Sequence, residues 1–307
     1  MDFAAVAGLS VAPGPRLFGR RIRPFLRRSV LEGRMDETTL IAFQRAEFSK
    51  AIRLQAWVLI VQVVIALLAC LAVVFDGATA AYIFAVAALV MTGVWVAMEF
   101  RFRDSREQAD RARRANVFSF GLKQALAPAI QEEISEGFSV TARNAEPFRD
   151  PDYYKSKAPP GPARLAEMVE ESVFWSKDLM RESAKLALLW VCLCLLLAIG
   201  AMLALILLAQ NGVMLAAVRV ICTLATLVVS MGSLGSAIMY HRAAHALEKL
   251  LVRFQILELS NYPLADLMFA ITEYYALVER APMFFPKVYE LRKPRLQKQW
   301  AKYKGEA

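Results

Sequence analysis

The sequence contains few of the residues from which catalytic and metal sites are usually built. Its 307 residues include only two histidines and four cysteines, and no two cysteines form a Cys-x-x-Cys pair. All four cysteines lie inside apolar segments, where a free thiol packs as a small apolar group: Cys70, Cys192, Cys194 and Cys222. This distribution indicates neither a disulfide framework nor a zinc site.

Enzymatic motifs are also missing. The sequence has no P-loop, no Gly-x-Gly-x-x-Gly fingerprint, no Gly-x-Ser-x-Gly elbow and no aspartate-rich metal motif. His241 and His245 have the i,i+4 spacing that can bind zinc, but Arg242 stands where the metalloprotease pattern requires glutamate. Two groups of glutamates are expected on solvated helix faces. The first is Glu132, Glu133 and Glu136, and the second is Glu167, Glu170 and Glu171. The sequence therefore predicts no enzyme and no cofactor.

Charged residues are nearly absent from four long apolar segments. The segments are residues 54–75, 78–98, 186–209 and 213–240. A helix needs about 20 residues to cross a hydrocarbon core of roughly 30 Å, and each segment meets that length. The first pair is joined by Asp76-Gly77 and the second pair by residues 210–212, so the four segments predict two tight transmembrane hairpins.

The basic residues indicate how these hairpins are oriented. Of the 37 Lys and Arg residues, 10 lie in residues 1–53, 15 in residues 99–185 and 11 in residues 241–307. The one that remains is Arg219, inside the fourth segment, and the two hairpin loops carry none. By the positive-inside rule, both termini and the central block face the cytoplasm.

These patterns predict an all-α membrane protein with two transmembrane helical hairpins, whose long helices extend into a cytoplasmic helical unit. The expected parts are a basic N-terminal arm (1–35), a lead-in helix (36–53), a first hairpin (54–98), a helical insert with a proline-rich loop (99–185), a second hairpin (186–240) and C-terminal cytoplasmic helices (241–307). We expect a multi-pass protein of the bacterial inner membrane.

The formal net charge of +9 fits contact with anionic lipid rather than with a nucleic acid polymer, because the basic residues flank the cytoplasmic ends of the apolar segments. Within the arm, residues 16–34 alternate arginine with apolar residues, a pattern suited to a membrane surface. The alternative for this arm is contact with an anionic ligand.

The fourth apolar segment carries a polar stripe. Its members recur at steps of three and four residues, which places them on one helical face: Arg219, Thr223, Thr226, Ser230 and Ser233. A charged and hydroxylated face is costly against lipid, so it should face protein or water. Small and hydroxyl residues can form a close helix–helix seam, and in an oligomer the same face can line a pore. Both interpretations remain open.

Three classes of protein fit a multi-pass chain without enzymatic motifs: a pore former, a non-conducting scaffold or sensor that recruits a cytoplasmic partner, and a small-solute transporter. Transporters usually have interrupted helices or charges near the middle of the membrane. The first three apolar segments are unbroken and uncharged, which disfavours the transporter. Four helices alone offer no obvious aqueous path, so a pore former is expected to be a homo-oligomer.

The layout resembles the SMODS-associated four-transmembrane pore-forming effectors of bacterial anti-phage systems, over residues 38–304. The stretches that carry the resemblance are residues 43–51 before the first apolar segment, residues 165–168 and 172–179 before the third, and Tyr274-Tyr275 with residues 281–289, Leu296 and Trp300 in the tail. An acidic-aromatic motif of that family, ending in Pro-Trp-Asn, has no clear match; residues 132–138 come nearest.

The resemblance implies an effector that oligomerises and permeabilises the inner membrane in antiviral defence. It also implies a cyclic nucleotide trigger, made by a partner nucleotidyltransferase. Arginine and aromatic groups can bind such an anion. The candidates lie in and beside the proline-rich segment: Arg143, Arg149, Tyr153, Tyr154, Lys155 and Lys157.

Overall fold

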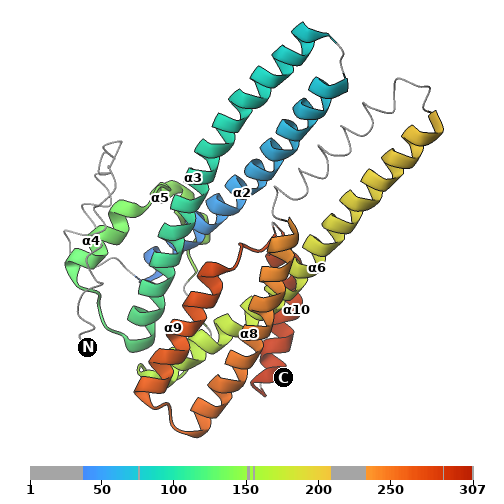
Figure 1. Cartoon of the computed structure of the whole chain (residues 1–307). Helices are drawn as coiled ribbons and strands as arrows, with labels where there is room; N and C mark the ends of the chain where they lie inside the picture. Colours follow the sequence, from blue (N-terminus) through green and yellow to red (C-terminus); the bar gives the residue numbers. More distant parts are fainter. Residues whose placement is uncertain are drawn as a thin grey trace, which may run out of the picture.

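The computed structural model describes residues 37–74, 77–150, 153–154, 156–208, 233–285 and 287–305, and these residues form helices without any strand (Figure 1). The helices are α2 (Glu37–Val74), α3 (Ala78–Leu122), α4 (Pro128–Gly137), α5 (Ala142–Ala145), the 3-10 helix η1 (Glu146–Phe148), α6 (Pro162–Leu208), α8 (Ser233–Leu259), α9 (Leu264–Arg280) and α10 (Val288–Tyr303). The all-α prediction is therefore confirmed for the described residues.

Two of these helices are long and apolar enough to cross a membrane. They are the stretch Thr38–Ala72 within α2, and α3, Ala78–Leu122. The two helices run side by side as an antiparallel hairpin (Figure 1). The prediction of two membrane-crossing helices in the N-terminal half is supported by their length and composition, and the outer half of the hairpin exposes large apolar side chains such as Tyr82 and Leu89.

α6 joins the amphipathic stretch after the proline-rich loop to the third apolar segment. It runs for 47 residues from Pro162 to Leu208. Its first half packs into the helical unit, whereas its second half exposes apolar side chains, among them Leu189 at 65% and Leu196 at 66%. The apolar ends of α2, α3 and α6 project from the same side of the helical unit (Figure 1).

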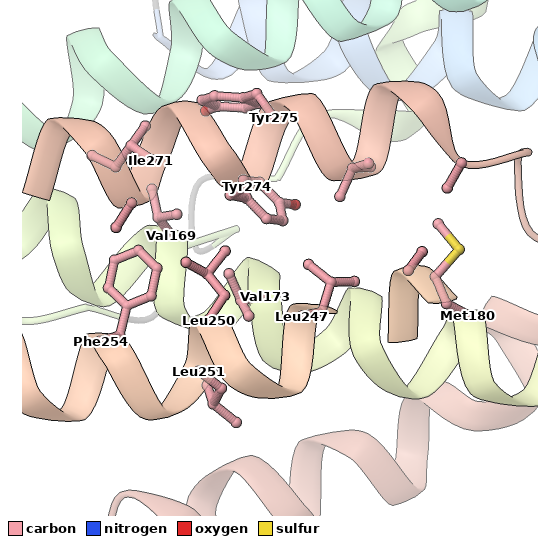
Figure 2. Close-up of a cluster of buried hydrophobic side chains, with 14 of the residues drawn as sticks. Val169, Val173, Met180, Leu247, Leu250, Leu251, Phe254, Ile271, Tyr274 and Tyr275 are labelled. Carbon is pink, nitrogen blue, oxygen red and sulfur yellow. The ribbon is translucent and has the colours of Figure 1, made fainter. Parts of the chain in front are cut away.

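The main core lies where α6, α8 and α9 meet. Figure 2 shows Leu247, Leu250 and Phe254 of α8 packed against Ile271 of α9 and Val173 of α6. Each of these five is at most 2% exposed. Full burial of such a side chain contributes roughly 1.5–3 kcal/mol, so this cluster holds the three helices together. The chain turns between α8 and α9 at Asn261 and Tyr262, both with positive φ, and α9 begins directly after Pro263.

Local ion pairs along α3 follow the expected helical spacing. Arg103 Nε lies 2.8 Å from a Glu99 carboxylate oxygen, and Arg111 Nη2 lies 3.4 Å from Glu107. Arg114 could pair with Asp110 at i,i+4 spacing, but it pairs instead with Glu279 of α9 at 3.4 Å. α9 packs alongside this part of α3, so a tertiary partner replaces the local one.

α10 is bound to α6 by two polar contacts. Arg292 forms a bidentate ion pair with Asp178, at 2.9 and 2.8 Å. Glu170 accepts a hydrogen bond from the Tyr303 hydroxyl at 2.7 Å and pairs with Lys304 at 2.5 Å. Glu170 is only 4% exposed, so the prediction of a solvated face was wrong at this position. The helix that covers it comes from more than 130 residues away in the sequence.

The extended segment after α9, residues 281–285, connects the two pairs of long helices. The Met283 carbonyl accepts from the Tyr240 hydroxyl of α8 and from Gln55 Nε2 of α2, the latter at 3.4 Å. The Phe285 amide donates to Ser183 Oγ of α6 at 3.3 Å. Segment 281–285 therefore contacts three helices that carry apolar segments.

Candidate functional site: a buried arginine and tyrosine cluster

One arginine of α3 lies inside the helical unit among aromatic rings. The Arg113 guanidinium carbon lies 5.6 Å from the ring centre of Phe48 in α2, and 5.7 and 5.6 Å from Tyr274 and Tyr275 in α9. Its Nη2 is 2.9 Å from a carboxylate oxygen of Asp110, one turn earlier in α3. We call these five residues the Arg113 cluster. Only 15% of the Arg113 side chain is exposed.

The sequence of α3 explains why this arginine is buried. Ala109 and Ala112 are both 0% exposed, and their small side chains allow close packing of α3 against its neighbours. Arg113 follows directly, so its side chain leaves the same crowded face and extends along it. Its long aliphatic stem can cover apolar surface while the guanidinium stacks on rings.

The charges of the Arg113 cluster do not balance. Asp110 is shared between Arg113 and Arg106, whose Nε lies 3.6 Å from the other carboxylate oxygen. Arg106 also donates to the last carbonyls of α9 and to the Ala281 carbonyl, at 2.6–3.1 Å. Two cations therefore face one carboxylate in a poorly hydrated region, where a further anion would be favoured.

Two polar groups of the Arg113 cluster are buried without a hydrogen-bond partner among the described residues: the Tyr275 hydroxyl and Nε of Arg113. Tyr275 is 5% exposed. Its neighbour Tyr274 differs, since its hydroxyl lies 3.3 Å from Ser176 Oγ of α6. Buried polar groups are usually hydrogen-bonded, and those that are not often mark functional sites.

A second arginine lies beside this cluster. Arg45 of α2 donates to the Phe148 carbonyl at 3.1 Å and to Asp150 at 3.2 Å, and its guanidinium carbon lies 5.5 Å from the ring centre of Tyr153. The ring of Tyr153 meets that of Tyr154 edge-on at 4.8 Å. The proline-rich segment thus brings two further tyrosines to the arginines.

Burial changes the pKa values of three tyrosines and of Arg113 at this site. Burial raises the pKa of the Tyr153 phenol to about 12, and burial also raises the pKa values of Tyr154 and Tyr275. These phenols are neutral hydrogen-bond donors. Burial acts to lower the pKa of Arg113, but Tyr274 and Asp110 outweigh it and the pKa lies above its ordinary value. Arg113 is thus a permanent cation, and the phenols of Tyr153, Tyr154 and Tyr275 near it are neutral.

No protein-family model matches this chain, and no curated protein and no solved structure is significantly similar to it. Its function is therefore inferred from its own residues.

The six ligand-binding candidates from the proline-rich region lie in different surroundings. Tyr153 and Tyr154 lie beside Arg45 and the Arg113 cluster. Arg149 is exposed and bonds Thr39 at 2.8 Å and Glu146 at 3.5 Å, and Arg143 and Lys157 are exposed. Lys155 lies outside the described residues.

The polar stripe of the fourth apolar segment cannot be placed in the same way. Arg219, Thr223, Thr226 and Ser230 lie outside the described residues, as does the arm 1–35, and Ser233 is the first residue of α8. The choice between a pore lining and a helix seam therefore remains a prediction.

Sequence reasoning missed the arginines of the site. Arg113 lies within the predicted helical insert (99–185) and Arg45 within the predicted lead-in helix (36–53), but neither was named as a site residue. One sequence signal was available. In the stretch 109–117, small or apolar residues alternate with the charged ones, which is typical of a buried helix face: Ala109, Ala112, Ala115 and Val117. Nothing in the neighbouring sequence indicated that Tyr274 and Tyr275 would contact Arg113.

Proposed function

We propose that this chain is a membrane pore-forming effector that oligomerises in the bacterial inner membrane and permeabilises it when a cytoplasmic anion of the nucleotide class binds at the Arg113 cluster. The observation that carries the proposal is that the buried Arg113, the cation of the cluster, and a membrane-length apolar segment belong to one continuous helix, α3. Ligand binding and the membrane are thereby mechanically connected.

The membrane placement is supported by two kinds of feature. α2 and α3 are long and apolar enough to cross. The sequence adds residues 186–209 and 213–240 as a second hairpin, and the second half of α6 exposes leucines as a lipid-facing helix does. In this arrangement the Arg113 cluster, α9 and α10 are cytoplasmic.

The site suits a phosphate attached to a flat ring system. Arginine binds phosphate through two parallel N–H donors, and Arg113 has donors that are not hydrogen-bonded within the described residues. Tyrosine faces can stack on a base. The neutral Tyr275 hydroxyl can donate to a phosphate oxygen. A nucleotide second messenger, supplied by a partner nucleotidyltransferase, has both groups.

Coupling follows from the length of α3. Arg113 is fifteen residues from the end of the second apolar segment at residue 98, which corresponds to roughly 22 Å of helix at 1.5 Å per residue. Because α3 is one rigid helix, a small rotation of α3 at Arg113 also rotates its apolar segment in the bilayer. The ligand then shifts an equilibrium between a closed and an open packing of the hairpins. The conduit in this proposal is the polar stripe, which includes Thr226 and Ser230.

The test is leakage from proteoliposomes that contain the purified full chain and an entrapped dye, titrated with a panel of cyclic di- and trinucleotides. Arg113→Met removes the cation and keeps the volume, and Arg111→Met is the matched control, since Arg111 is half-exposed and pairs only with surface glutamates. Wild type and the control should leak in response to one nucleotide, whereas Arg113→Met should not.

Two measurements separate loss of binding from loss of folding. Arg113→Lys keeps the charge but not the bidentate geometry, so it should bind weakly and fold normally. Size-exclusion chromatography with multi-angle light scattering should show an oligomer for all variants. A monomer under every condition, or nucleotide-induced leakage by Arg113→Met, would reject the proposal.

The alternative is a non-conducting scaffold or sensor that recruits a cytoplasmic protein. It is favoured by apolar side chains exposed near the turn between α8 and α9, including Leu259 at 89%, Leu264 at 62% and Phe269 at 65%. Such a patch is typical of a protein contact. Nucleotide binding without leakage would favour this function, and saturable uptake of one solute would favour a transporter.

A further inference from the structure

A groove of about 520 Å³ lies between α6 and α8, where the apolar half of α6 meets its charged half. Six of its lining residues define its character: Arg181, Lys185, Leu188, Leu234, Ile238 and Arg242. It is separate from the Arg113 cluster, with which it shares no residue.

The groove is divided by chemistry along the helix axes. One end is apolar, formed by Leu188 and Leu234, both 54% exposed, and by Ile238 at 45%. The other end is basic, and its lining contains no acidic residue. On α6, Leu188 comes three residues after Lys185, and on α8, Arg242 comes four residues after Ile238. The two ends are therefore only about 4.5–6 Å apart along the helix axes at 1.5 Å per residue.

The cations of the groove are only partly neutralised by neighbouring acids. Arg181 lies 3.2 Å from Glu248, and Lys185 lies 2.9 Å from Glu182. Glu182 is also shared with Arg292 at 3.5 Å. Arg242 is exposed and has no ion pair within the part of the chain that the structure describes.

Two histidines complete the basic end. The rings of His241 and His245 lie 4.5 Å apart in an edge-on arrangement, and His245 Nδ1 is 3.7 Å from Glu248. Imidazole N–H groups can donate to a phosphate oxygen. The described residues contain no group of three or more metal-ligating side chains, so the histidine pair is not part of a larger metal cluster there.

We propose that this groove binds one anionic phospholipid, with the phosphate at Arg242 and Lys185 and an acyl chain along Leu188, Leu234 and Ile238. A soluble anion would use the basic end and leave the adjoining leucines uncovered. Only an amphiphile satisfies both ends at the observed spacing, and basic pockets between membrane helices on the cytoplasmic side bind anionic headgroups. The inference rests on the membrane placement of α6 given under the proposed function.

The experiment is native mass spectrometry of the purified full chain, released from nanodiscs that contain equal amounts of phosphatidylglycerol and phosphatidylcholine. The wild type should retain one phosphatidylglycerol in preference to phosphatidylcholine. The double variant Lys185→Gln, Arg242→Gln should lose this preference. Each basic residue near an anionic surface contributes roughly a fivefold gain in affinity, so the loss should be about 25-fold.

Two further variants locate the lipid. Lys249→Gln removes a charge from the same helix α8 outside the groove and should change nothing. Ile238→Gln leaves every charge in place and should reduce retention of the lipid. Soluble glycerophosphoglycerol, which has the headgroup but no acyl chains, should not displace phosphatidylglycerol from the groove at concentrations at which phosphatidylglycerol itself saturates the groove. Competition by this compound, or an equal effect of Lys249→Gln, would overturn the lipid assignment.

Failure of this inference can be distinguished from failure of the pore. Equal retention of both lipids by a wild-type protein that still leaks dye with nucleotide overturns the groove alone. Selective retention of phosphatidylglycerol without any leakage supports the groove and rejects the pore. Extraction of the chain from membranes by alkaline carbonate would contradict both, because α6 would not lie in the bilayer.

Discussion

Among the residues that hold α2, α3 and the segment after α4 together, a buried glutamate of α2 should be the one whose replacement destabilises the protein most. Glu47 is 0% exposed and accepts hydrogen bonds from Ser105 Oγ of α3 and from Ser139 and Val140 after α4, both of which donate through their backbone amides. Replacing Glu47 by Ala removes the acceptor and leaves two buried amides without a partner. An unsatisfied buried donor costs about 1–3 kcal/mol, so we expect a loss of about 3–5 kcal/mol.

The conservative change should cost less. In Glu47→Gln one amide oxygen can still accept from Ser139 and Val140, and the amide nitrogen can donate to Ser105. Only the charge assistance is lost, so we expect a loss of about 1–2 kcal/mol.

The assay is thermal unfolding in detergent. The measured quantity is the fraction of protein that remains monodisperse at each temperature. For a chain of 307 residues 1 kcal/mol corresponds to about 1.5 °C, so Glu47→Ala should lower the midpoint by about 4.5–7.5 °C and Glu47→Gln by about 1.5–3 °C. Glu133→Ala is the control, since its ion pair with Arg111 is at the surface and contributes at most about 1 kcal/mol. A Glu47→Ala midpoint within 2 °C of this control would refute the reasoning.

Three further predictions concern packing, helix docking and pH. Gly121→Ala should destabilise the protein by about 1–3 kcal/mol, because a Cβ there lies 2.9–3.1 Å from Leu165, whereas Gly93→Ala meets open space and should be neutral or stabilising in the same melt. Asp178→Asn should weaken the bidentate pair that docks α10 and speed hydrogen exchange in that helix. Burial raises the pKa of Tyr153 to about 12, so its stabilising contribution should be present below pH 10 and lost toward pH 12; Tyr153→Phe should remove this part of the alkaline transition.

The helices themselves could be predicted because their signals are local. The proline-rich loop predicted in the insert separates η1 from α6, and the turn before Pro263 lies at residues with positive φ. The continuity of α6 from an amphipathic stretch into an apolar one also follows from the absence of any proline between Pro162 and Leu208. Propensity and periodicity act over a few turns, which is the range these features need.

The candidate site could not be predicted because it depends on which helix faces meet. Arg113 has a good local partner in Asp110, and this pair hid the contact with Tyr274 and Tyr275, about 160 residues later. Glu170 was misread for the same reason, since its partners Tyr303 and Lys304 lie in the last helix. A solvated charged face and a face covered by another helix have the same local pattern.

The shared carboxylate of Asp110 gives the proposed signal a route beyond α3. In the proposed mechanism an anion at Arg113 takes over part of the charge neutralisation that Asp110 provides, and the Asp110 carboxylate then pairs more closely with Arg106. Arg106 donates to the Ala281 carbonyl, where segment 281–285 begins. That segment contacts α2 through Gln55, α6 and α8. Under the proposed function, a change in this one ion pair would therefore reach α2, α3, α6 and α8 together, as concerted opening of a pore requires.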